Sequence, residues 1–305
     1  MSTGTFSFPS LPAGPPSKRN WYQELIDHPA CNGDPLVIQQ AYESHRQEFR
    51  QKNVDALSAL PATRPRADHA LLTHLSASNG DVGARNAQDV NCMVIWTRPP
   101  PMILATIERI QTRIKDALGD GVWLVPKDDI HLSVLELSHR HSIDYLRGVL
   151  RKIGTERIET MLRVPSLLDE KPGLVRPQLS FDKLGFALSV VPSIATPFTY
   201  HHLRADLQRR ALESGIAIDT CYTALSAHVT IARFVMDGLL EEEGANEKFL
   251  ELVKAVNREL GEEYGCVPEG AASEWRVGEL ELQLGYLKFG RDQSQAEQFH
   301  THDRK

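Results

Sequence analysis

Long apolar runs, paired cysteines and a strong excess of one charge are all missing from this sequence. No stretch of about 18 or more apolar residues occurs, so we expect no membrane-spanning helix. Residues 1–20 are rich in Ser, Gly and Pro without an apolar segment; we expect a disordered tail and no secretory signal. The cysteines form no Cys-x-x-Cys pair, which argues against a disulfide framework or a thiolate zinc site. These absences favour a protein of the cytoplasm or nucleus.

The charge balance limits the partners that the surface can hold. A formal net charge of −6 over 305 residues argues against a broad basic surface that binds long nucleic acid. It permits a local basic pocket for a small phosphorylated substrate or an RNA end. The sequence indicates no oligomeric state.

The first third of the chain differs from the rest in its pattern. A helical pattern over 34–51 carries Leu36, Ile38, Tyr42 and Phe49 among polar residues. Residues 61–90 lack periodicity and predict a long loop. We therefore expect 21–90 to be an N-terminal helical and loop extension appended to the main domain. The sequence does not show whether this extension is a lid, a partner-binding arm or a segment without a role.

The main domain is expected over residues 91–290, followed by a C-terminal tail over 291–305. Strand-like runs alternate there with amphipathic helical patterns of 12 to 18 residues, which predicts an α+β domain. The order of strand, helix and strand occurs twice. We predict strands over 92–97, 122–125, 130–137, 179–181, 186–191 and 223–235, two closing strands about Gly285 within 275–289, and helices over 102–118, 142–153, 198–214 and 246–263.

Two short motifs stand out within this pattern. They are His131-Leu132-Ser133-Val134 and His228-Val229-Thr230-Ile231, each in a strand-like run. Alternate residues of a strand share a face, so the histidine and the hydroxyl residue of each motif point one way and the apolar residues the other. Two such strands at one cleft would offer a ligand two imidazoles and two hydroxyl groups.

Both motifs resemble a known family. The segments VPKDDIHLSVLEL and TALSAHVTIARF are similar to the paired signatures of the two-histidine (2H) phosphoesterase superfamily, which includes RNA ligase/cyclic nucleotide phosphodiesterase enzymes. The resemblance covers residues 91–290. It implies a two-lobed α+β fold in which sheets related by a pseudo-two-fold axis, flanked by helices, form a central cleft.

The resemblance also implies an activity and a catalytic quartet. The activity is that of a metal-independent phosphodiesterase, a phosphoric diester hydrolase, acting on a cyclic nucleotide phosphate, a 2′-5′ linkage or an RNA 3′ end. The quartet consists of His131, Ser133, His228 and Thr230. Many members have threonine where this chain has Ser133; serine keeps the hydroxyl group, so we expect activity to survive.

The chemistry of phosphodiester cleavage suits these residue types. One histidine can deprotonate the attacking oxygen while the other protonates the leaving oxygen, because the unperturbed imidazole pKa is about 6.5. The hydroxyl groups can donate hydrogen bonds to the phosphoryl oxygens. The sequence does not show which histidine is the base. The reaction requires no metal or other cofactor, and no carboxylate–histidine cluster in the sequence demands one.

Three further residues are weaker candidates for binding substrate. Tyr222 could stack on a base, as aromatic side chains do with single-stranded RNA. Arg233 follows the second motif but has the parity of Val229, which predicts that it faces away from His228. His139, near the end of the first motif strand, could extend the cleft.

Two other functions fit the same residues. One is a non-catalytic module that binds a nucleotide or a partner in the cleft. The other is the same acid–base pair used on a metabolite without phosphate, which the absence of an obvious arginine cluster leaves open.

Overall fold

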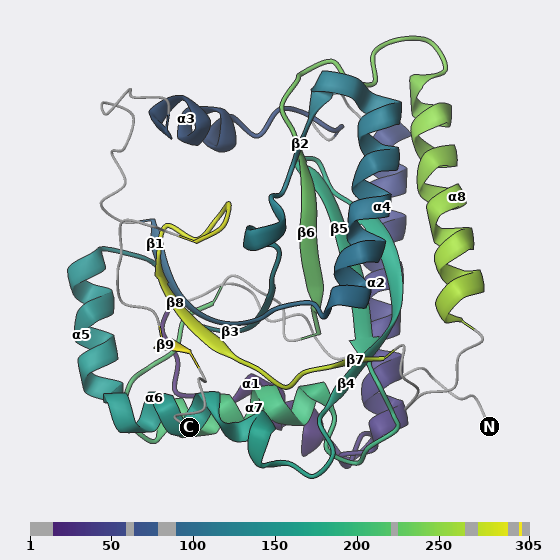
Figure 1. Ribbon diagram of the computed structural model, residues 1–305. Coiled ribbons are helices and arrows are strands. Elements are labelled where there is room, and N and C mark those ends of the chain that lie inside the picture. Colours follow the sequence, from purple (N-terminus) through teal and green to yellow (C-terminus); the bar gives the residue numbers. More distant parts are fainter. Residues whose placement is uncertain are drawn as a thin grey trace.

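The computed structural model describes residues 15–58, 64–78, 90–220, 225–265, 274–291 and 299–300. Helices and strands alternate through most of these ranges (Figure 1). The helices are α1 Trp21–Ile26, α2 Pro35–Ser58, α3 His69–Ser78, α4 Pro101–Leu118, α5 Ile143–Ile153, α6 Thr155–Leu162, α7 Tyr200–Leu212 and α8 Ala245–Tyr264. The strands are β1 Asn91–Thr97, β2 Val122–Leu124, β3 Leu132–His141, β4 Gly173–Phe181, β5 Gly185–Pro192, β6 His228–Phe234, β7 Trp275–Arg276, β8 Glu281–Gly285 and β9 Phe299–His300.

The strands form two antiparallel sheets, so the predicted α+β class is confirmed. One sheet has the order β3-β1-β8-β9 and the other the order β2-β6-β5-β4-β7. Strand β3 is at an edge of the first sheet and contacts β6 of the second. The two motif strands therefore meet where the sheets meet. The pseudo-two-fold relation between the sheets stays a prediction.

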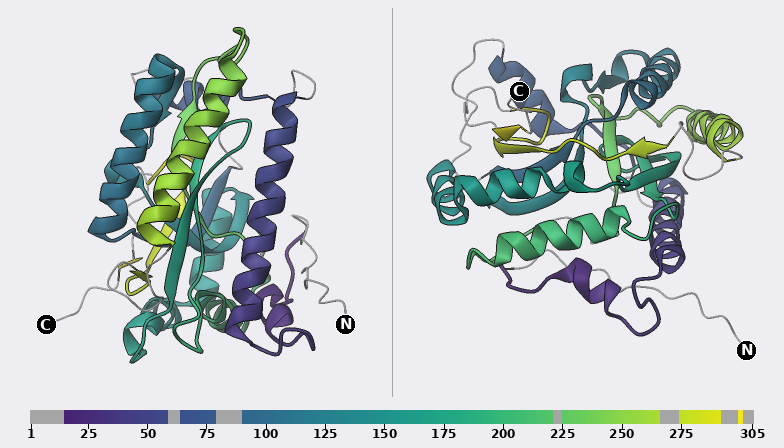
Figure 2. Two further views of the ribbon diagram at one scale, coloured as in Figure 1. Left: turned by 90° about the vertical axis from the view of Figure 1, so that its right-hand side faces the viewer. Right: turned by 60° about the horizontal axis from the view of Figure 1, so that its bottom comes forward.

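Helices cover both faces of the five-stranded sheet. In Figure 2, left, α4 and α8 lie on one side of this sheet and α2 lies on the other. Helix α4 has Pro101 in its first turn and an apolar stripe that includes Ile103, Ile107 and Ile110, all buried. The predicted helix over 102–118 is thus confirmed. Helix α7 lies along β3, and α1 packs against α7.

The N-terminal segment up to α2 is part of the core and not an appendage. Tyr22, Leu25, Ile38 and Tyr42 are buried in the same apolar cluster as the strands of the main domain. For residues 21–58, this corrects the expectation that 21–90 form an appended extension. Sequence periodicity could not reveal it, because the buried face of α2 is set by the strands against which the helix packs.

Other differences from the predicted elements are local. Helix α3 lies within 61–90, where we expected a loop, and residues 79–89 lie outside the described residues. Ser17 pairs with Ile218 in a β-bridge, within the expected tail over 1–20, of which 1–14 lie outside the described residues. Gly285 ends β8 and does not separate two strands. Strand β9 falls in the expected C-terminal tail and pairs with β8.

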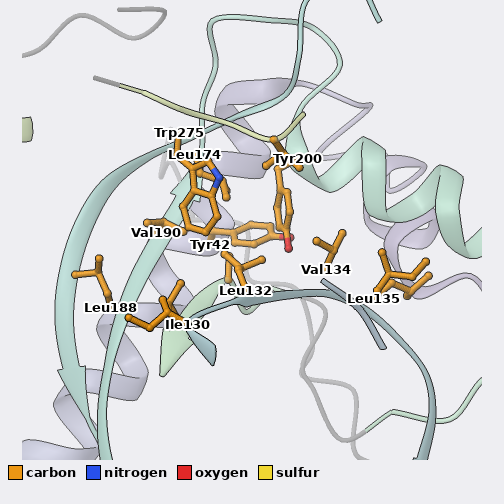
Figure 3. Close-up of a cluster of buried hydrophobic side chains, with 14 of the residues drawn as sticks. Tyr42, Ile130, Leu132, Val134, Leu135, Leu174, Leu188, Val190, Tyr200 and Trp275 are labelled. Carbon is orange, nitrogen blue, oxygen red and sulfur yellow. The ribbon is translucent and has the colours of Figure 1, made fainter. Parts of the chain in front are cut away.

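The first motif strand shows the predicted alternation of faces. Leu132 and Val134 are fully buried, whereas His131 and Ser133 are partly exposed. Figure 3 shows Leu132 and Val134 in the apolar cluster that also holds Tyr42 and Tyr200. The core therefore fixes which way the polar residues of this strand point. No helix among the described residues is both long and apolar enough to cross a membrane.

Candidate active site

The pairing of β2 with β6 brings the two motifs together. The segment after β2 continues along β6, where the Val125 backbone nitrogen donates to the oxygen of Ile231 at 3.0 Å. The single turn Lys127–Asp129 then leads directly into His131 and β3. Arg98 holds this turn, donating to the backbone oxygens of Asp128 at 2.7 Å and Ile130 at 2.9 Å. The first motif therefore lies beside the second.

All four motif residues line one small cavity, which we call the histidine cavity. Its volume is about 100 Å³. Two cationic residues, Arg233 and Lys288, also line it. The full lining is Val125, Asp129, His131, Ser133, His228, Thr230, Arg233, Leu287, Lys288 and Phe289. The arrangement offers imidazoles, hydroxyl groups and positive charge to one small anionic group.

The ring of His131 is fixed on two sides. Its Nδ1 atom lies 2.7 Å from the backbone oxygen of Asp129. Because that oxygen can only accept, Nδ1 carries the proton, and in the neutral ring Nε2 keeps its lone pair. The indole of Trp96 stacks on the imidazole. The ring is therefore oriented, with a basic nitrogen still available for proton transfer.

Burial shifts both motif histidines in the same direction. It lowers the pKa of His131 to about 3, although the hydrogen bond to the Asp129 backbone opposes the shift. It lowers the pKa of His228 to about 4, opposed by the negative charge of Asp182. Both rings are consequently neutral at pH 7 in the protein without ligand.

His228 is oriented by a hydroxyl group two residues earlier. Its Nδ1 atom lies 2.8 Å from Ser226 Oγ. The carbonyl oxygen of Ser226 accepts a hydrogen bond of 2.9 Å from Nη1 of Arg204 on α7. A buried cation therefore anchors the residue that contacts the second histidine.

Arg204 also holds the first motif strand. Its Nε atom donates to the backbone oxygen of Val134 at 2.8 Å. The guanidinium also donates to the hydroxyl groups of Tyr42 and Tyr22, and it is almost completely buried. One side chain thus links β3, the segment before β6 and the N-terminal helices. Sequence reasoning missed this residue, because a lone arginine in a helix gives no signal of such contacts.

Arg233 shares the cavity with His228, which corrects the prediction that it faces away. Thr230 pairs with Ala187 and Ala232 pairs with Phe186, so Ile231 is an extra residue opposite β5. Such a β-bulge shifts the alternation of side chains by one residue. Ile231 and Ala232 are both buried, and Arg233 returns to the face of His228 and Thr230. A parity argument fails across a bulge that sequence alone does not show.

A buried carboxylate holds the two cations of the cavity. Asp68 accepts from Arg233 at 3.0 Å and from Lys288 at 3.2 Å, and its side chain is 3% exposed. Both cations lie over the ring of Phe289. Gly290 follows at a φ of +143°, and a Cβ there would lie 2.4 Å from Cγ of Asp129. This close approach seats residues 287–291 against the turn that precedes His131.

A larger cavity adjoins the histidine cavity, and we call it the α2 cavity. It has a volume of about 440 Å³ and shares His228, Thr230 and Arg233 with its smaller neighbour. Tyr42, His45, Arg46 and Phe49 of α2, together with Asp182 and residues of β4, β5 and the segment before β6, complete its lining. A volume of this size is in the range of small-molecule sites.

One of the weaker sequence candidates, His139, is not brought to this site. His139 lines neither cavity and lies near Cys92 and Glu136, at the other end of β3. Tyr222 lies outside the described residues, as do its neighbours in 221–224.

No protein-family model matches this sequence, and no curated protein matches it. Among solved structures, the chain is similar to "Structure of Kluyveromyces marxianus Usb1 with uridine monophosphate". That likeness covers 70% of this chain and 98% of the other, at 12% sequence identity and a TM-score of 0.39.

Proposed function

We propose that this protein is a phosphodiesterase in which His131 and His228 act as general acid and base. The observation that carries the proposal is the lining of the histidine cavity by both motifs, each with its histidine and its hydroxyl residue. This is the arrangement that the resemblance to the 2H phosphoesterases implies. The reaction breaks one ester bond of a phosphodiester, by hydrolysis when water attacks and by transesterification to a cyclic phosphate when a ribose hydroxyl group attacks.

Each side chain has a role in this proposal. One neutral imidazole removes the proton of the attacking water or ribose hydroxyl group, and the protonated imidazole donates its proton to the leaving oxygen. Ser133 and Thr230 donate hydrogen bonds to the nonbridging oxygens. Arg233 supplies positive charge as negative charge develops on those oxygens. No step requires a metal ion.

The proposal requires one proton beyond those of the ligand-free site. Both rings are neutral at pH 7, because burial holds the pKa of His131 at about 3 and that of His228 at about 4. A bound phosphodiester brings a negative charge that favours the protonated form of a nearby imidazole. Substrate binding is thus accompanied by uptake of a proton, which becomes the proton of the general acid.

The α2 cavity favours a nucleotide as the organic part of the substrate. It joins the histidine cavity through residues that both share, and it combines apolar walls with Arg46. Phe49 is 41% exposed and lies in this lining, where an aromatic base could stack on it. We propose a cyclic nucleotide phosphate, a 2′-5′ linkage or an RNA 3′ end as the substrate.

The experiment is a hydrolysis panel with EDTA present. It comprises 2′,3′-cyclic mononucleotides, 2′-5′ dinucleotides and short RNAs with a free 3′ end. The wild type is compared with the His131→Ala, His228→Ala double variant, and circular dichroism confirms that both are folded. We expect turnover of one substrate class that disappears in the double variant.

Other results would assign a different function. Tight nucleotide binding without any product would support a binding module. Histidine-dependent turnover of phosphate-free metabolites alone would support a different acid–base reaction. Equal hydrolysis by the wild type and the double variant would contradict the proposal.

A further inference from the structure

A second group of chemically active side chains lies away from the histidine cavity. It consists of Cys92 at the start of β1 and of Glu136 and His139 in the second half of β3. None of the three lines either cavity of the candidate active site. The group is therefore a separate cluster of side chains.

The three side chains converge on one ring nitrogen. Nδ1 of His139 lies 2.8 Å from Oε1 of Glu136 and 3.5 Å from Sγ of Cys92. In a relay of thiol, imidazole and carboxylate, the thiol and the carboxylate contact different ring nitrogens. Here the thiol and the carboxylate both contact Nδ1. The three side chains therefore form a cluster around this nitrogen and not a relay. The potential ligand atoms all lie within 4.8 Å of one another.

Irregular backbone places these residues on one side of the sheet. Residues three apart on a regular strand point to opposite faces. Val94 pairs with Glu136 and Met93 pairs with Ser138, so one extra residue of β3 lies between these pairs. This bulge lets Glu136 and His139 meet. Arg140, the next residue, has a φ of +59°, which is uncommon for a residue other than glycine.

The neighbouring residues hold the group in position. Thr220 Oγ1 donates to Oε2 of Glu136 at 2.8 Å, which leaves Oε1 directed to the cluster. Asp219 accepts from the backbone nitrogen of His139 at 2.8 Å. Metal ligands in proteins are commonly oriented by hydrogen bonds of this kind.

We propose that Cys92, Glu136 and His139 bind a zinc ion. A thiolate, an imidazole nitrogen and a carboxylate oxygen are the ligand types that zinc takes. In a tetrahedral zinc site the sulfur and nitrogen ligands are about 3.5 Å apart, from the usual bond lengths. The Cys92 to His139 distance of 3.5 Å already fits this value.

The charges of the site also suit a dication. The Glu136 side chain is 2% exposed, and zinc would compensate the buried carboxylate and the thiolate together. Binding replaces the hydrogen bond between Nδ1 and Oε1: the Nδ1 proton leaves, the neutral ring keeps its proton on Nε2, and the thiol proton leaves to solvent. His139 is 26% exposed, which gives the ion an entry path and room for a water molecule as fourth ligand.

This proposal departs from the expectation that the chain holds no metal. That expectation rested on the absence of a Cys-x-x-Cys pair, on a reaction that requires no metal and on the lack of a carboxylate–histidine cluster that demands one. The fold instead brings one cysteine of β1 to a glutamate and a histidine of β3, which no spacing in the sequence reveals.

The test uses full-length protein treated with chelator and then titrated with Zn²⁺ or Co²⁺ alone. We expect one equivalent of Zn²⁺ to bind and Co²⁺ to give a thiolate-to-metal charge-transfer absorption band. In Cys92→Ser the band disappears and zinc affinity falls at least 100-fold; in His139→Gln affinity falls at least tenfold. Cys31→Ser, which alters a buried cysteine on the N-terminal segment, is the matched control and keeps both.

Circular dichroism and thermal melting confirm that each variant is folded. The proposal is overturned if the wild type binds no Zn²⁺ at a stoichiometric level. It is equally overturned if the charge-transfer band and the zinc affinity of Cys92→Ser match those of the wild type. Neither readout depends on hydrolysis, so this result and the test of the phosphodiesterase are separate.

Discussion

The indole ring of Trp96 stacks on the imidazole ring of His131, with 3.5 Å between the ring centroids and 10° between the planes. Trp96 is 1% exposed and comes from β1, the neighbour of β3. The stack both orients the imidazole and excludes water from one of its faces. It connects the packing of the four-stranded sheet to the chemistry of the histidine cavity.

Replacing Trp96 by leucine should raise the pKa of His131. Burial is the main cause that lowers this pKa to about 3, so removing the stacked ring moves the value upward, toward 6.5. The measurement is an NMR titration of the histidine ring protons in both proteins. Trp96→Phe is the milder control, because the indole Nε1 has no hydrogen-bond partner among the described residues. An unchanged or lower pKa in Trp96→Leu contradicts this account.

Ser226→Ala should lower kcat while the protein stays folded. The variant removes the hydroxyl group that lies 2.8 Å from Nδ1 of His228. Loss of one such hydrogen bond corresponds to about 1 kcal/mol, or a fall in kcat of about fivefold. Ser214→Ala is the matched control, since Ser214 Oγ donates to the backbone oxygen of Ala211 and Ser214 lines neither cavity. Equal kcat values for the two variants would count against a role for Ser226 in orienting the ring.

Arg233→Gln should lower kcat/KM about 10-fold to 100-fold, because a charge-assisted contact to a phosphoryl oxygen is lost. Arg276→Gln is the matched control. Arg276 pairs with the buried Glu274 at 2.7 Å, as Arg233 pairs with the buried Asp68, but it lines neither cavity. The measurement is kcat/KM at limiting substrate. Similar kcat/KM values for the two variants would assign Arg233 a purely structural role.

The sequence predicts well what depends on local periodicity. The helix over 102–118 and the alternation of His131 and Ser133 with buried neighbours both follow from it. It fails where a long-range contact decides. Ile231 is a bulge residue only because of how β6 pairs with β5, and that pairing turns Arg233 toward the cavity. The contacts of Arg204 likewise come from segments far apart in the chain.

The same limit applies to the outer parts of the site. His139 shares a strand with Ser133, yet it lies at the other end of that strand and outside both cavities. Two of the four apolar residues that indicated the helix over 34–51, Leu36 and Phe49, are exposed. The contribution of α2 to the α2 cavity thus follows from tertiary packing and not from its pattern.

Acid should destabilise the fold through His131, His201 and His228, whose pKa values are lowered in the folded protein. Burial lowers the pKa of His131 and His201 to about 3 and that of His228 to about 4, against 6.5 for an unburied ring. As pH falls below about 6.5, the unfolded chain binds protons that the folded protein does not. The free energy of unfolding therefore decreases toward pH 4, by about 1.4 kcal/mol per pH unit for each such histidine.

His201→Gln isolates one of these contributions at a residue outside both cavities. Urea melts between pH 6.5 and 5 give the slope of the unfolding free energy against pH, which reports how many protons the chain takes up on unfolding. We expect this number to be lower by about one in His201→Gln than in the wild type. Tyr42→Phe is the control: it removes the hydroxyl group that contacts Nδ1 of His201 at 3.0 Å and Arg204 at 3.1 Å, but it keeps the His201 ring, so the slope should match that of the wild type. A slope in His201→Gln equal to that of the wild type contradicts this assignment.

The central claim is that His131 and His228 act as one unit on a phosphodiester. The most direct test measures kcat for His131→Ala, His228→Ala and the double variant on the substrate that the wild type hydrolyses. Residues that act together show strongly non-additive losses. We predict that each single variant falls by at least 1,000-fold and that the double variant is no slower than the slower single variant. Wild-type kcat in either folded single variant would contradict the account.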